Sequence, residues 1–169
     1  MSINFLETSC QTRSNNRKFG LCDDPPPAKR PAYIDEINGE NWIAVVDNYY
    51  QEDVTFTAID NCIVFPPKSD GKSFKRCDGV LTYANTVAFV ELKQRDEDGS
   101  VWVKDAEKQL RISIEKFEQT EAANRFKIKR AYIVNSERPR FRDSQAVRME
   151  KFTDETTYIL RIEARIRIA

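Results

Sequence analysis

Residues 77–95, CDGVLTYANTVAFVELKQR, constrain the fold more than any other stretch of the chain. Two runs rich in β-branched and aromatic residues, VLTY and VAFVEL, are separated by ANT, which is the pattern of two antiparallel strands joined by a tight turn. If Ala84 and Asn85 form a two-residue loop, counting outward in pairs places Asp78 opposite Glu91. The stretch therefore predicts a β-hairpin in which two carboxylates meet across one ladder.

A cation is expected beside these two acids. Directly opposed side chains on antiparallel strands have Cβ atoms roughly 4.5–5.5 Å apart, and like charges at that spacing are destabilising. Lys93 has the same parity along its strand as Glu91, so it projects from the same face of the sheet. The hairpin thus predicts a cluster of Asp78, Glu91 and Lys93 on otherwise buried strands.

A helix and a further strand are predicted after the hairpin. Asp105 can cap a helix whose apolar positions recur at spacings of four and three, a stripe suited to packing on a sheet. The stripe consists of Ala106, Leu110, Ile114 and Phe117. Residues 128–134 form an apolar run, which predicts a buried strand parallel to the second hairpin arm if the helix is a crossover.

This order of elements resembles the PD-(D/E)XK nuclease superfamily. The resemblance is carried by Asp78-Gly79 and Glu91-Leu92-Lys93, followed by the helix-like DAEKQLRISIEKFEQTEAAN and the strand-like KIKRAYIV, and it covers roughly residues 53–135. Cys77 stands where that superfamily often has a proline. The resemblance implies an α/β (α+β) fold with a restriction-endonuclease-like three-layer core, in which helices flank a central mixed β-sheet.

The resemblance also implies a function, namely metal-dependent hydrolysis of phosphodiester bonds in DNA. Asp78, Glu91 and the Leu92 carbonyl would hold Mg²⁺ or Mn²⁺, and Lys93 would assist the attacking water or stabilise the charged transition state. Gln109 is similar in position to a helix glutamine that some exonuclease-like branches place near the metal. A further acidic ligand from the N-terminal part is frequent in the superfamily, and the candidates are Glu40, Asp47 and Asp60.

The amino-acid composition excludes several classes of enzyme and kinds of site. Histidine is absent, which excludes Ser-His-Asp and Cys-His hydrolases and His-ligated zinc enzymes. The four cysteines show no CxxC spacing, so neither a zinc site nor a structural disulfide is expected. No apolar run of about 18 residues and no basic-then-apolar leader pattern is present, so a cytoplasmic location is expected.

The length of 169 residues predicts one ordinary domain. Residues 1–38 are polar and Pro-rich and are expected to form a flexible N-terminal arm, with the nuclease-like domain at 39–169. In an alternative interpretation the arm docks on a partner or wraps its own domain. Its anchors would then be Phe5, Leu6, Phe19 and Leu21.

Three segments of the domain have weaker patterns. Residues 40–50 are compatible with helix or strand, and Val45-Val46 favours a strand that pairs with VTFTAID. Residues 61–65 could extend the sheet. Residues 158–169 alternate apolar and charged side chains, which predicts one half-buried strand with an arginine-rich outer face.

Two basic stretches are candidates for contact with nucleic acid, because phosphate contacts release counterions and so supply affinity. Their residues are Lys72, Lys75 and Arg76 before the hairpin, and Arg138, Arg140 and Arg142 near the C-terminus. Solvated loops would explain the same residues.

Two further functions stay open beside a deoxyribonuclease. One is a catalytically inactive nuclease-fold module that serves in a larger complex, and the other is a ribonuclease or nucleotide phosphodiesterase with the same site. Small size and balanced charge favour a homodimer or a larger protein partner that supplies target recognition.

Overall fold

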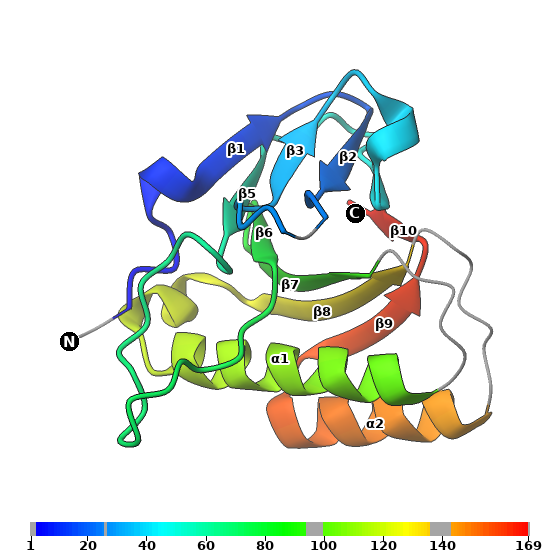
Figure 1. Cartoon of the computed structure of the whole chain (residues 1–169). Helices are drawn as coiled ribbons and strands as arrows, with labels where there is room; N and C mark the ends of the chain where they lie inside the picture. The colour runs from blue at the N-terminus through cyan, green and yellow to red at the C-terminus, as the bar shows by residue number, and fades with distance from the viewer. Residues whose placement is uncertain (1–2, 26, 94–99, 136–142, 169) are drawn as a thin grey trace.

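The computed structural model describes residues 3–25, 27–93, 100–135 and 143–168 (Figure 1). In this part the chain has an α+β fold with two sheets. The elements are β1 (Gln11–Ser14), β2 (Lys18–Cys22), β3 (Tyr33–Asp35), β4 (Ala44–Asp47), β5 (Val54–Ala58), β6 (Gly79–Tyr83), β7 (Thr86–Lys93), α1 (Ser100–Glu118), β8 (Ile128–Asn135), α2 (Asp143–Thr156), β9 (Ile159–Glu163) and β10 (Arg165–Arg167), with 3-10 turns at Thr8–Cys10, Gly39–Asn41 and Glu121–Arg125. Neither α1 nor α2 combines the length and apolar content needed to cross a bilayer.

The two sheets and the helices form three layers. The larger sheet has the order β1-β5-β6-β7-β8-β9, with antiparallel pairs up to β7 and parallel pairs between β7, β8 and β9. Helices α1 and α2 cover one face of this sheet, and the smaller sheet β10-β4-β2-β3 lies over the other (Figure 1). The predicted central mixed sheet is therefore confirmed. The expectation that helices flank it is met on one face of the described structure, whereas a second sheet occupies the other.

The central hairpin is buried on both faces, which explains its nearly continuous apolar runs. Val80 and Phe89 pack toward the helices in one hydrophobic cluster, while Leu81 and Val90 pack toward the smaller sheet in another. Along each strand, successive residues belong alternately to the two clusters, because neighbouring side chains of a strand point to opposite faces of the sheet.

The hairpin has the predicted register. Tyr83 pairs with Thr86 and Gly79 with Val90, so Ala84 and Asn85 form the turn. Strand β8 runs parallel to β7, again as predicted. The four predicted stripe residues of α1 are also buried.

Helix α1 begins earlier than predicted. It starts at Ser100, and Asp105 lies inside it rather than capping it. Trp102 and Val103 are buried and extend the apolar stripe toward the N-terminus, so packing continues for a further turn.

The flexible-arm interpretation of residues 1–38 is wrong for the described residues of that segment. Strand β1 pairs with β5 in the larger sheet, and β2 pairs with β4 in the smaller one. Phe5, Phe19 and Leu21 are buried and Leu6 is half-buried, as expected if the segment wraps its own domain. No boundary at residue 38 separates the two parts, because backbone pairing crosses it.

A disulfide joins Cys10 to Cys62, contrary to the expectation of none. The two residues are 52 positions apart in the sequence. They meet because β1 pairs antiparallel with β5, with Gln11 opposite Thr57, which brings the residue before β1 close to the loop after β5. Cysteine spacing alone could not reveal this contact.

Three predicted strand arrangements need correction. Strand β4 confirms a strand within residues 40–50, but it lies in the smaller sheet and does not pair with β5. Residues 61–65 form no strand. The C-terminal alternation is present, yet the chain bends at Ala164 and divides into β9 in the larger sheet and β10 in the smaller one.

Candidate active site

The hairpin brings the two predicted carboxylates together. Asp78 and Glu91 have exposed fractions of 8% and 2%. The Asp78 N–H donates to Glu91 Oε1 at 3.1 Å, and the Leu92 N–H donates to Asp78 Oδ2 at 2.6 Å. Lys93 Nζ lies 3.2 Å from Glu91 Oε2. The predicted cluster of two acids and one amine is thus present on the helix-covered side of the sheet.

Burial raises the pKa of both carboxyls. For Asp78, burial acts first and repulsion from Glu91 adds to it, so its pKa lies well above the ordinary value. For Glu91, burial raises the pKa while contacts with Asp78 and Lys93 oppose the rise. Two full negative charges in this space are therefore unfavourable without a cation.

A third acid, Asp23, belongs to the cluster and was missed from the sequence. It follows β2 directly, and a hydrogen bond links it to Asp78. Burial first, and then the charges of Asp78 and Asp60, raise the pKa of Asp23 to about 7. The signal in the sequence is the pair of acids immediately after the apolar run FGLC, a pattern that is also compatible with the polar arm predicted for residues 1–38.

The three candidates for an extra acidic ligand differ in their position relative to the Asp78 cluster. Asp60 lies close enough to Asp23 to affect its pKa and pairs with Arg76 at 3.8 Å. Asp47 lies in β4, where Arg165 binds it through hydrogen bonds of 2.8 and 2.6 Å. Glu40 is exposed in the Gly39–Asn41 turn. Of the three, Asp60 alone is linked to the Asp78 cluster.

Helix α1 supports the site through Ser113, which the sequence did not indicate. The buried Ser113 Oγ accepts a hydrogen bond of 2.9 Å from the Cys77 N–H, next to Asp78. Gln109 lies one turn earlier on the same helix face. Its Oε1 atom is buried and meets no hydrogen-bond donor among the described residues. A buried carbonyl oxygen in this position can accept a hydrogen bond from a bound group.

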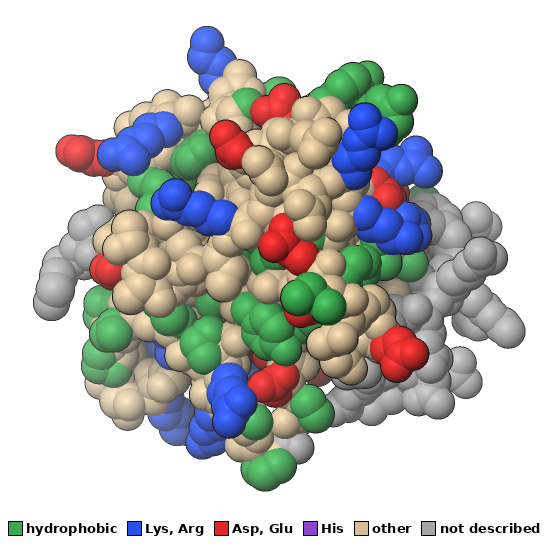
Figure 2. All heavy atoms as spheres, turned by 90° about the horizontal axis from the view of Figure 1, so that it is seen from above, with side chains coloured by type: hydrophobic (Ala, Val, Ile, Leu, Met, Phe, Trp, Pro, Cys, Tyr) green, Lys and Arg blue, Asp and Glu red, His purple; other side chains and the backbone are tan. Residues whose placement is uncertain are grey.

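The residues predicted to contact phosphate differ in their surroundings. Arg76 is engaged within the fold, because its Nη1 donates to the Ile63 carbonyl at 2.7 Å and its guanidinium stacks on Phe65 at 4.7 Å. Lys72 and Lys75 are exposed on the loop that precedes the hairpin. Arg138, Arg140 and Arg142 lie outside the described residues. Figure 2 shows basic and acidic side chains interspersed on the side of the smaller sheet, in keeping with the balanced charge.

The donor set is suited to a hard divalent cation. Mg²⁺ typically takes one or two protein carboxylates and completes its shell with water and substrate oxygens. Asp78 and Glu91 supply that number, and their raised pKa values show that a positive charge would be favourable beside them. The described residues contain no group of three or more His, Cys, Asp or Glu side chains already arranged around a metal position.

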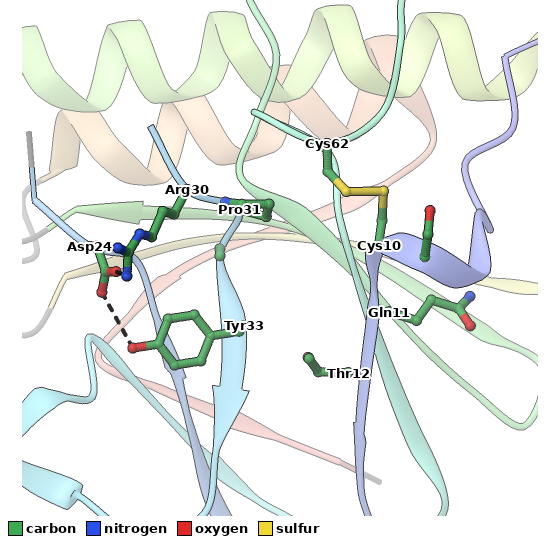
Figure 3. A pocket seen from close by; sticks show the side chains of 10 residues that line it. Cys10, Gln11, Thr12, Asp24, Arg30, Pro31, Tyr33 and Cys62 are labelled. Carbon is green, nitrogen blue, oxygen red and sulfur yellow. Dashed lines mark hydrogen bonds and ion pairs between the residues drawn. A yellow bond between two sulfur atoms is a disulfide. The ribbon is translucent and has the colours of Figure 1, made fainter. Parts of the chain in front are cut away.

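A cavity of about 390 Å³ lies beside the disulfide, apart from the Asp78 cluster (Figure 3). Asp24 and Arg30 line it and lie 3.7 Å apart, and the Tyr33 hydroxyl donates to Asp24 Oδ1 at 3.3 Å. The Cys10–Cys62 bridge forms part of the wall. Because Asp24 and Arg30 pair with each other, this cavity is a weaker candidate for an active site than the Asp78 cluster.

Comparison of the chain with protein-family models, curated proteins and solved structures finds no match.

Proposed function

We propose that the protein is a metal-dependent nuclease that hydrolyses phosphodiester bonds of DNA, with its active site at Asp78, Glu91 and Lys93. The observation that carries the proposal is the meeting of two buried carboxyls with an amine 3.2 Å from one of them. Buried acids of this kind are costly to ionise, and raised pKa values cluster at functional sites. The resemblance of the Asp, hairpin, Glu-X-Lys order to the PD-(D/E)XK superfamily supports the same assignment.

Each group has a part in the proposed reaction. Asp78 and Glu91, with the Leu92 carbonyl, would hold Mg²⁺ or Mn²⁺, which when bound lowers the pKa of water and offsets negative charge on the phosphate. Lys93 orients the attacking water or stabilises charge on the phosphate oxygens. Asp23 supplies a further carboxylate beside Asp78. Gln109 offers an oxygen that meets no hydrogen-bond donor among the described residues.

The test is cleavage of plasmid and linear DNA with Mg²⁺ or Mn²⁺. We expect Glu91→Gln and Lys93→Ala each to reduce the rate by about a hundredfold or more, the scale of a lost proton-transfer or charge-stabilising group. Glu150→Gln and Lys108→Ala are matched controls, because both residues are exposed on the helices. Cleavage that survives both site substitutions would reject the assigned site. If RNA is offered as a second substrate under the same conditions, a preference for it would identify a ribonuclease.

One observation favours a non-catalytic module instead. Both carboxylates accept hydrogen bonds from backbone amides of the hairpin, so the site is partly closed by its own strands. Titration calorimetry with Mn²⁺ separates the two functions. A nuclease requires a binding signal that Glu91→Gln removes, whereas no signal and no change in thermal stability with Mn²⁺ would favour the module.

A further inference from the structure

An arginine-lined groove of about 650 Å³ opens on the larger sheet, away from the acidic cluster. Strands β8, β9 and β10 contribute its lining residues, which are Arg130, Tyr132, Ile159, Arg161, Glu163 and Arg167. We call this the arginine groove. Its size is that of sites for small organic molecules or short polymer segments rather than for a single ion.

The strand register explains why these side chains share one face. In the parallel β8–β9 pair, Arg130 lies opposite Ile159 and Tyr132 opposite Arg161. The intervening residues, Ala131 and Leu160, are buried in the cluster that packs against the helices. The groove therefore lies on the face opposite the helices, beside the edge of the smaller sheet, where β10 adds Arg167.

The acidic cluster lies on the other face of the same sheet. Glu91 is opposite Ile133 in the β7–β8 register, and Ile133 belongs to the helix-side cluster. The arginine groove is thus separated from Asp78 and Glu91 by the thickness of the sheet. It contains none of the six residues predicted to contact nucleic acid, but Arg161 and Arg167 belong to the arginine-rich face predicted for residues 158–169.

Charge in the groove is unbalanced. Three guanidinium groups face one carboxylate, that of Glu163. Neither Arg161 nor Arg167 forms an ion pair within 4 Å of any described residue. Arg167 lies opposite Asp47 and helps to lower the pKa of that carboxyl, but the direct partner of Asp47 is Arg165, at 2.6 Å. Arg130 is held by its 3.5 Å hydrogen bond to the Tyr83 hydroxyl. Guanidinium groups without a carboxylate partner are suited to bidentate binding of phosphate.

We propose that the arginine groove binds the sugar-phosphate backbone of a nucleic-acid strand. Its cations come from three strands, so a ligand that crosses the strands meets several of them, as a polymer with regularly repeated negative charge does. Ile159 is 46% exposed and gives an apolar contact for a base or sugar. An acidic peptide, which usually adds along a strand edge through its backbone, is the alternative ligand that competition by polyglutamate tests. The proposal does not require the Asp78 cluster to be catalytic.

The experiment is fluorescence anisotropy of a short labelled single strand with excess EDTA, which prevents cleavage. We expect Arg161→Gln/Arg167→Gln to weaken binding about tenfold or more at moderate salt and to lower the slope of log K against log salt by about 1.4, the value for two phosphate contacts on a single strand. Lys108→Gln/Lys151→Gln removes the same charge from the exposed helix surface and should leave both quantities near those of the wild type.

Two further variants make the outcome decisive. Arg161→Lys/Arg167→Lys keeps the charge but loses bidentate geometry, and binding between that of the wild type and the glutamine pair supports the proposal. Glu91→Gln should bind like the wild type, so loss of catalysis and loss of groove binding are distinguishable. Unchanged binding in the glutamine pair, an equal loss in the lysine control, or equal competition by polyglutamate would each overturn the proposal.

Discussion

Asp23 is the residue whose titration reports most directly on the acidic cluster. Burial and the nearby carboxyls of Asp78 and Asp60 raise its pKa from 3.8 to about 7. The folded chain then binds this proton more tightly than the unfolded chain, so the free energy of unfolding falls as pH rises from about 4 to about 7. Below that window both states are protonated, so the stabilising contribution is fully present and no longer changes with pH.

We expect Asp23→Asn to flatten this pH dependence, because an amide cannot ionise. The difference from the wild type between about pH 4 and about pH 8 should be on the order of 1 kcal/mol, since Asp23 is half-buried and solvent screens part of the effect. Urea unfolding with a metal chelator at both pH values measures it. Asp154→Asn, on the exposed side of α2, is the control, and an identical pH dependence in Asp23→Asn and the wild type would contradict the assignment.

At the scale of residues, sequence reasoning found the part of the site that one hairpin determines. Asp78, Glu91 and Lys93 lie within 16 positions, and their relation follows from strand pairing and parity. Asp23 reaches the cluster through the packing of one sheet on another. That contact depends on the whole fold, so local patterns in the sequence do not contain it.

The elements show the same distinction between local and distant determinants. The hairpin, β8 and the stripe of α1 were predictable because each is encoded in a continuous apolar pattern. The C-terminal alternation was equally clear, yet a bend at Ala164 sends β10 to a different sheet. Alternation indicates which side chains are buried, but it does not specify which strand lies alongside.

The hairpin turn offers a prediction at this scale. Ala84 is exposed and has a φ of 48°, a conformation that glycine adopts without the steric cost that Cβ imposes. We expect Ala84→Gly to stabilise the folded chain by about 0.5 kcal/mol, because relief of that cost exceeds the added entropy of glycine in the unfolded chain. Thermal and urea unfolding measure the change.

Asn85→Gly is the matched variant in the same turn. Asn85 is exposed and is not among the residues with positive φ, so glycine there should give no gain or a small loss. Equal stabilisation by both substitutions would show that the backbone conformation of Ala84 is not the cause.

At the scale of the whole molecule, one hairpin contributes residues to two hydrophobic cores. Its alternate residues pack against the helices and against the smaller sheet, so the acidic site is attached to the most deeply buried part of the fold. The N-terminal strands complete both sheets, and the Cys10–Cys62 bridge connects the first of them to the loop that carries Asp60. The bridge therefore couples the N-terminal segment to the surroundings of the site.

The disulfide does not agree with the expected cytoplasmic location, because the cytoplasm keeps most thiols reduced while oxidising compartments preserve such bridges. Closing a loop of 52 residues lowers the entropy of the unfolded chain and stabilises the folded one by up to about 4 kcal/mol. We expect reduction of the wild type to lower the midpoint of thermal unfolding by several degrees. Cys10→Ser/Cys62→Ser should start near the reduced midpoint and show no response to reductant, since the remaining cysteines, Cys22 and Cys77, are free thiols. A wild type whose midpoint does not respond to reductant would show either that the bridge does not form in solution or that β1 holds its place without it, and mass measurement after thiol alkylation separates these two results.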